Sequence, residues 1–174
     1  MHKPLFICGM PGSGKSGLGK RLANRMLWSF VDLDQLIEQR CGKSPAVLIT
    51  ELGEAAFRQM EAEALRSLSS KTNTVIACGG GTPCFLGNLE WMQSQGIVLF
   101  IDMPLKSIMQ RLLQSKGQAK RPLLGNGEAE LAQRLEMIWQ QREAYFKQID
   151  WWINGLHIDL EALALELKQR IASV

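Results

Sequence analysis

Short hydrophobic runs alternate with longer amphipathic stretches along the chain. The runs are bounded by polar or glycine-rich residues, and they predict strands at 4–8, 29–32, 74–78, 97–101 and 149–154. Between them, hydrophobic residues recur every three or four positions. This pattern predicts helices at about 17–26, 54–69, 85–95, 128–146 and 160–171, with further helices beginning near 34, 45 and 104.

The strand predicted at 97–101 indicates how the sheet is built. Its sequence, IVLFI, is hydrophobic throughout, as expected for a parallel strand that is covered on both faces. Strands that alternate regularly with helices are typical of an α/β fold. We therefore predict a three-layer αβα sandwich with a central parallel sheet of about five strands.

A phosphate-binding motif follows the first predicted strand. Residues 9–16, GMPGSGKS, match the pattern G-x-x-x-x-G-K-[ST] between a strand and a helix, a context that disfavours a chance glycine-rich turn. In such a loop the backbone N–H groups surround phosphate oxygens, the lysine adds charge and the serine hydroxyl binds Mg²⁺. The motif predicts a P-loop NTPase-type fold and phosphate contacts from Gly12, Ser13, Gly14, Lys15, Ser16 and Gly17.

Two carboxylates follow the second predicted strand. Asp32 ends that strand, and Asp34 stands where the next helix begins. The carboxyl ends of parallel strands face the ligand crevice of such a sheet, so one carboxylate is expected near Mg²⁺ and one beside a substrate hydroxyl. The structural alternative is that Asp34 caps the helix.

Two arginines lie beside the hydrophobic faces of predicted helices. Arg58 lies at the edge of the face of helix 54–69, and Arg142 lies on the face of helix 128–146. A buried guanidinium needs a partner, and it can bind a carboxylate through two hydrogen bonds. A surface position for Arg58 and a structural carboxylate partner for Arg142 both stay open. The face of the second helix is expected to comprise Leu131, Leu135, Ile138 and Tyr145.

Two glycine-rich segments stand out from the helical and strand patterns. Gly79, Gly80 and Gly81 follow the strand at 74–78, and three consecutive glycines indicate a close approach of the backbone to a ligand. The segment at about 114–127 combines glycines with cations between two helices. It is predicted to be a flexible lid in which Arg121 meets charge on a transferring phosphoryl group, with a solvated loop as the alternative.

Composition and charge narrow the class of protein. The 174 residues fit one domain, and a dispersed net charge of +3 favours a small anionic substrate over nucleic acid. No apolar stretch is long enough to cross a membrane, and because the first strand is predicted to begin at residue 4, we expect no signal peptide. The four cysteines form no C-x-x-C pair, so we expect reduced thiols in a cytoplasmic protein.

Taken together, the motifs resemble shikimate kinase over essentially the whole chain. The resemblance rests on the P-loop, the D-x-D pair at 32–34, the stretch GEAAFRQME at 53–61, the triple glycine, RPLL at 121–124 and Arg142. It implies a small-molecule kinase that uses ATP and Mg²⁺ to phosphorylate the 3-hydroxyl of shikimate, in aromatic amino acid biosynthesis. It further implies one kinase domain over 1–174, with substrate-binding helices at about 34–60 and the lid at about 114–127.

The resemblance implies a role for each residue at the acceptor end. Arg58 and Arg142 are expected to hold the shikimate carboxylate. Asp34 is expected to contact the ring hydroxyls and to take the proton from the 3-hydroxyl. The backbone of the triple glycine, above all the N–H of Gly80, is expected to contact the substrate.

At the nucleotide end the resemblance implies a second set of roles. Ser16 and Asp32 are expected near Mg²⁺, and Arg111 is expected against the adenine ring. Lys15 and Arg121 are expected to stabilise charge on the transferring phosphoryl group. These are the residues expected to bind ATP and its metal.

Three other functions share some of these sequence features. A kinase for another acidic polyol, such as gluconate, shares the P-loop and differs in the acceptor. A nucleoside monophosphate kinase is disfavoured because Asp32 and Asp34 would face an anionic second nucleotide. A GTP-binding switch would need the motif N-K-x-D, which the sequence lacks. We expect a monomer with neither a nucleic-acid nor a membrane partner.

Overall fold

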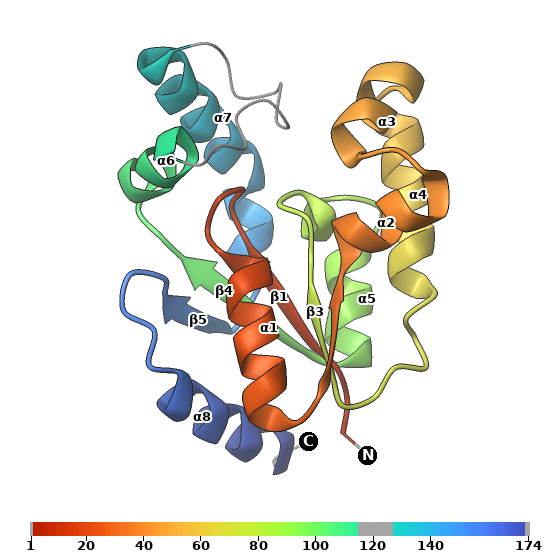
Figure 1. The fold of residues 1–174 in the computed structure, drawn as a ribbon, viewed down its shortest axis with the longest axis vertical. Helices are drawn as coiled ribbons and strands as arrows, with labels where there is room; N and C mark the ends of the chain where they lie inside the picture. Colours follow the sequence, from red (N-terminus) through yellow and green to blue (C-terminus); the bar gives the residue numbers. More distant parts are fainter. Residues whose placement is uncertain (1, 115–126, 173–174) are drawn as a thin grey trace.

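The computed structural model describes residues 2–114 and 127–172 (Figure 1). It contains one sheet of five parallel strands in the order β2-β3-β1-β4-β5. These strands are β1 (Leu5–Gly9), β2 (Ser29–Asp32), β3 (Thr74–Ala77), β4 (Ile97–Asp102) and β5 (Trp151–Asn154). All five overlap the hydrophobic runs that predicted them, although β5 begins two residues after the predicted start at 149, and the α/β architecture is confirmed.

Helices cover both faces of the sheet. They are α1 (Lys15–Met26), α2 (Leu33–Cys41), α3 (Pro45–Leu52), α4 (Glu54–Arg66), α5 (Asn88–Gln95), α6 (Leu105–Gln114), α7 (Glu128–Phe146) and α8 (Leu160–Ala172), with a short 3₁₀ turn, η1, at Thr82–Cys84. Along β1, Leu5 and Ile7 belong to the core cluster that includes α1 and α8. Phe6 and Cys8 belong to the cluster that includes α4, α5 and α7. The central strands β1 and β3 are buried at every residue, which explains their continuous hydrophobic sequences, whereas the edge strands β2 and β5 are partly exposed.

Two helices are shorter than their hydrophobic patterns predicted. Helix α4 ends at Arg66, because Leu68 and Ser69 donate to carbonyls three residues back and form a tighter turn. Helix α5 begins at Asn88, because Leu86 and Gly87 have positive φ angles of 51° and 65° that interrupt the helix. The expected helix at 85–95 therefore begins three residues late.

The buried face of α7 differs from the prediction at one position. Leu131 and Leu135 are buried as expected, but Tyr145 is 38% exposed and Phe146 is fully buried instead. Because an α-helix has 3.6 residues per turn, Leu135, Arg142 and Phe146 lie on the same side of α7, which faces the core. Tyr145 lies to one side of these residues, so its place in the predicted face is wrong.

Residues 115–126 of the segment predicted to be a lid, which include Arg121, lie outside the described residues. Gln114 ends α6 and Glu128 begins α7, so the segment joins these two helices.

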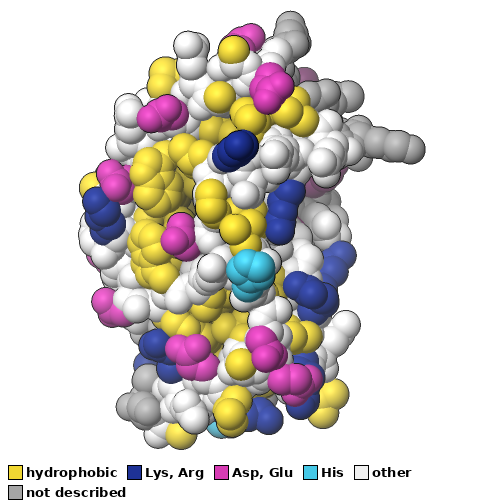
Figure 2. All heavy atoms as spheres, turned by 90° about the vertical axis from the view of Figure 1, so that its left-hand side faces the viewer, with side chains coloured by type: hydrophobic (Ala, Val, Ile, Leu, Met, Phe, Trp, Pro, Cys, Tyr) yellow, Lys and Arg dark blue, Asp and Glu magenta, His cyan; other side chains and the backbone are white. Residues whose placement is uncertain are grey.

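The surface at the β5 edge of the sheet mixes charges of both signs. Figure 2 shows cations and carboxylates interspersed on that face, around a group of hydrophobic side chains. Among the helices of the described ranges, none is both long and apolar enough to cross a membrane.

Candidate active site

The P-loop joins the central strand to the first helix. β1 ends at Gly9 and α1 begins at Lys15, so the amino end of α1 points its backbone N–H groups into the loop. Gly12 and Gly14 adopt positive φ angles of 84° and 94°, a conformation that side-chain-bearing residues rarely adopt. The ammonium of Lys15 donates to the carbonyls of Gly9 and Met10 at 3.0 and 2.9 Å. Local sequence therefore creates a loop suited to phosphate.

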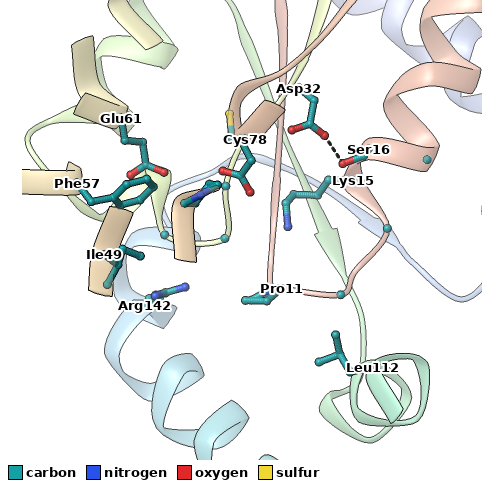
Figure 3. Close-up of a pocket in the computed structure, with 18 of the residues that line it drawn as sticks. Pro11, Lys15, Ser16, Asp32, Ile49, Phe57, Glu61, Cys78, Leu112 and Arg142 are labelled. Atoms are coloured by element: carbon teal, nitrogen blue, oxygen red, sulfur yellow. Dashed lines mark hydrogen bonds between the residues drawn. The ribbon is translucent and has the colours of Figure 1, made fainter. Parts of the chain in front are cut away.

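One cavity of about 610 Å³ extends from this loop across the carboxyl ends of the strands. The cavity is lined by almost all the described residues that the sequence predicted as site residues. These are Gly12, Gly14, Lys15, Ser16, Gly17, Asp32, Asp34, Arg58, Gly79, Gly80, Gly81, Arg111 and Arg142. Ser13 is the exception, because it is buried. Figure 3 shows Lys15, Ser16 and Asp32 on one side of the cavity, with Phe57, Glu61 and Arg142 on the other.

Asp32 joins the P-loop helix to the second helix. Its Oδ2 atom accepts a hydrogen bond of 2.5 Å from the Ser16 hydroxyl (Figure 3). Its Oδ1 atom accepts from the backbone N–H of Gln35 at 3.2 Å, so Asp32 is the N-cap of α2. The alternative that Asp34 caps this helix is wrong: α2 begins at Leu33, and Asp34 lies within its first turn and lines the cavity.

The triple glycine lies against the side chains of the site. A Cβ atom on Gly79 would lie 2.9 Å from Glu61 Oε1 and 3.0 Å from Asp34 Oδ1. On Gly80 it would lie 2.9 Å from the ring of Pro11. None of the three has a positive φ angle, so what requires glycine here is the close packing. The sequence analysis explained the three glycines by a ligand alone, whereas protein side chains also lie close to their backbone.

Arg58 is held in place by two carboxylates of its own helix. Its Nη1 atom donates to Glu61 Oε2, and its Nη2 atom donates to Glu54 Oε1, both at 2.9 Å. The guanidinium also lies 4.2 Å from the centre of the Phe85 ring, a cation–π distance. Arg58 is only 8% exposed, so the surface alternative is wrong.

Arg142 differs from Arg58 in its surroundings. It is half-buried on α7, and burial is the main cause that lowers the pKa of its guanidinium below the ordinary value. The nearby charge of Arg58 lowers this pKa further. Within residues 2–114 and 127–172, no hydrogen bond or ion pair joins Arg142 to a carboxylate. The cavity wall therefore carries a positive charge suited to an anion.

Arg111 lies at the P-loop end of the cavity. It stands in the last turn of α6, and its Nη1 atom donates to the backbone carbonyl of Ser13 at 3.4 Å. A Cβ atom on Gly14 would lie at the same distance from that nitrogen. Arg111 therefore lies beside the P-loop in space, although it is 98 positions from Ser13 in the sequence.

Known proteins identify this combination of fold and site. The family model for shikimate kinase matches residues 11–172 of the chain. The chain belongs to the shikimate kinase family. The shikimate kinase of Bacteroides fragilis is 36% identical over 148 residues, which cover 84% of this chain and 82% of that one.

Solved shikimate kinases share the whole fold. The crystal structure of the enzyme from Bacteroides thetaiotaomicron has a TM-score of 0.90 and 31% sequence identity, and the match covers 99% of both chains. The enzyme from Acinetobacter baumannii in complex with shikimate has a TM-score of 0.85 and 28% identity, over 99% of this chain and 94% of that one.

Some residues that line the cavity were not among the site residues predicted from the sequence. They are Pro11, Pro45, Ile49, Phe57, Glu61, Cys78 and Leu112. Glu61 was detectable in part, since it lies three positions after Arg58 and so on the same face of a helix. The apolar residues gave no chemical signal, because packing residues have the same types.

Proposed function

We propose that this chain transfers the γ-phosphoryl group of ATP to the 3-hydroxyl of shikimate, in the route to the aromatic amino acids. The observation that carries the proposal is the shared cavity, which the P-loop, Asp34, Arg58 and Arg142 all line. A phosphate-binding loop alone would support only nucleotide binding. Two arginines beside a carboxylate at the far end support an acceptor that carries both a carboxylate and hydroxyl groups.

At the nucleotide end, the P-loop holds the phosphates of ATP. The N–H groups at the start of α1 and the ammonium of Lys15 supply positive charge, and Arg111 borders the same region. Arg121 would add charge from the segment outside the described residues. We propose that the protein is a monomer that acts in the cytoplasm without a nucleic-acid or membrane partner.

Ser16 and Asp32 would hold Mg²⁺. Their oxygens lie 2.5 Å apart beside the P-loop, and a hydroxyl with a carboxylate is a donor set that suits this ion. Mg²⁺ commonly takes one or two protein groups and completes its coordination with phosphates and water. When bound, Mg²⁺ neutralises charge on the phosphates.

At the acceptor end, the arginines bind the shikimate carboxylate and Asp34 orients the 3-hydroxyl. The hydroxyl oxygen forms a bond to the γ-phosphorus as the bond from that phosphorus to the β,γ-bridging oxygen breaks. Asp34 accepts the hydroxyl proton, and ADP leaves with the bridging oxygen. The N–H of Gly80 contacts the substrate, while Lys15 stabilises charge that spreads over the phosphoryl oxygens.

The test is ADP release from Mg·ATP with shikimate, with gluconate and with neither acid. We expect strong stimulation by shikimate alone. The Arg142→Ala variant should lose most of that stimulation, because it removes an arginine from the cavity wall. Arg134→Ala is the matched control, since Arg134 lies on the same helix, pairs with Glu130 and does not line the cavity. Stimulation by gluconate, or by neither acid, contradicts the proposal.

A further inference from the structure

A chain of hydrogen bonds runs from Arg58 through the protein interior to Arg66. Arg58 donates to Glu61 Oε2 at 2.9 Å, and the Thr82 hydroxyl donates to Glu61 Oε1 at 2.7 Å. The side-chain amide of Asn88 donates to the Thr82 carbonyl at 2.9 Å. Arg66 in turn donates to Asn88 Oδ1 at 2.7 Å. Thr82 and Asn88 are fully buried, and neither lines the cavity.

Thr82 occupies the point where this chain meets the triple glycine. It directly follows Gly81 and begins the turn η1. Its backbone N–H donates to the Gly79 carbonyl at 3.2 Å, which closes a turn around the glycines. Its hydroxyl holds Glu61, and its carbonyl is held by Asn88. One residue therefore links the glycine loop to the carboxylate that holds Arg58.

The packing around Gly79 makes these positions interdependent. A Cβ atom on Gly79 would lie 3.0 Å from the Thr82 hydroxyl and from Asp34 Oδ1, and 2.9 Å from Glu61 Oε1. The three oxygens therefore surround the same point of the backbone. Since so little space is left, Glu61 cannot move far without disturbing Asp34 or the loop.

The Thr82 hydroxyl also supplies one of the hydrogen bonds that the buried carboxylate of Glu61 needs. The carboxylate is only 1% exposed, and each of its oxygens accepts one of the two hydrogen bonds described above. A buried carboxylate that loses one donor is left partly unsatisfied, and it moves or admits water to recover the bond. Either response would shift the guanidinium that Glu61 holds.

We propose that Thr82 is a positioning residue for the acceptor, which acts through Glu61 to hold Arg58 and Asp34 in the geometry that binds shikimate. The proposal rests on the proposed function, because its readout is the use of shikimate. It assigns Thr82 no contact with either substrate. Loss of the Thr82 hydroxyl should therefore affect the acceptor end and not the nucleotide end. A defect in overall folding would instead affect both ends.

The test compares Thr82→Val, which keeps the shape and removes the hydroxyl, with Thr82→Ser, which keeps the hydroxyl. We expect Thr82→Val to raise the KM for shikimate about tenfold, and to change the KM for ATP less than about twofold. Thr82→Ser should stay within about threefold of wild type in both. Thr74→Val is the matched control: Thr74 is equally buried and donates one hydrogen bond, to the Thr72 carbonyl, at the opposite end of β3. Its KM for shikimate should be normal.

Two further variants keep the test decisive. If Thr82→Val does not fold, Thr82→Ala and Thr82→Ser give the same comparison, because they differ by one oxygen atom. In a double-mutant cycle with Glu61→Gln, the effects should not add if Thr82 acts through Glu61.

The possible results separate the two proposals. A normal KM for shikimate in the folded variant without the hydroxyl, or an equal rise in both KM values, overturns the positioning role. Additive effects in the cycle overturn the route through Glu61. If the wild-type protein does not phosphorylate shikimate, the proposed function fails and the role of Thr82 fails with it.

Discussion

The guanidinium of Arg58 packs directly against the backbone of Gly81: a Cβ atom on this glycine would lie 2.8 Å from Nη2 and 3.0 Å from Cζ of the arginine. Arg58 has little freedom to retreat, because Glu54 and Glu61 hold it from two sides. The glycine is therefore part of what determines where the guanidinium lies.

Gly81→Ala should displace Arg58. The added methyl group needs space that the arginine occupies, so we expect the KM for shikimate to rise about tenfold or more, with the KM for ATP nearly unchanged. Steady-state kinetics with each substrate varied in turn measure this. Gly19→Ala is the control, because its Cβ would meet Phe30 at 2.5 Å, away from the cavity. It should lower stability without raising the KM for shikimate, and a normal KM in Gly81→Ala would contradict the packing argument.

The two carboxylates that hold Arg58 should differ in importance. The Glu61 side chain is 1% exposed and the Glu54 side chain is 58% exposed. Breaking a buried ion pair costs about 3–5 kcal/mol, whereas an exposed pair contributes about 0–1 kcal/mol. Glu61→Gln should therefore lower the free energy of unfolding in urea and raise the KM for shikimate, and Glu54→Gln should do much less of both. Equal effects of the two variants would show that burial does not separate them.

The cysteines should react in the order of their exposure. Burial raises the pKa of the Cys84 thiol from 9.0 to about 12, so this group stays protonated and unreactive at pH 8. Cys41 is partly exposed and should be labelled first by iodoacetamide, as followed by mass spectrometry. Above pH 9 the unfolded chain releases a proton that folded Cys84 retains, so its contribution to stability is lost as the pH rises from about 9 to 12. Rapid labelling of Cys84 in the native protein at pH 8 would contradict the raised pKa of its thiol.

The parts of the site that sequence could predict are those formed by contiguous residues. The P-loop needs only a strand, eight residues and a helix, and all three occur together in the sequence. The carboxyl ends of the strands meet at one edge of any parallel sheet, so Asp32 and the triple glycine could be expected near the P-loop. The cavity has all of these on its wall.

The parts that sequence could not predict depend on contacts between distant residues. Thr82 reaches Glu61 across 21 positions, and Asn88 reaches back to Thr82 through its side chain. Threonine and asparagine are ordinary in turns, so neither signals its buried partner. The sequence suggested only Asp34 as a possible cap of α2, and it is the backbone geometry that shows Asp32 to be the cap.

Asp34→Asn should abolish most of the turnover while leaving shikimate bound. The amide can still accept a hydrogen bond from the 3-hydroxyl but cannot take up its proton, so we expect kcat to fall about 100-fold or more with a small change in KM. The measurement is steady-state ADP release with a binding assay for shikimate. Asp102→Asn is the matched control, since Asp102 is an exposed aspartate at the end of the parallel strand β4 and lies outside the cavity wall.

The ratio of the two effects distinguishes proton transfer from orientation. If Asp34 only orients the hydroxyl, the amide should do so nearly as well, and kcat in Asp34→Asn would stay close to that of wild type. If Asp34 accepts the proton, the loss should be confined to kcat and should depend little on the shikimate concentration. A rise in KM with normal kcat would instead make Asp34 a binding residue, and the proton would then leave the hydroxyl by way of water or the phosphoryl oxygens.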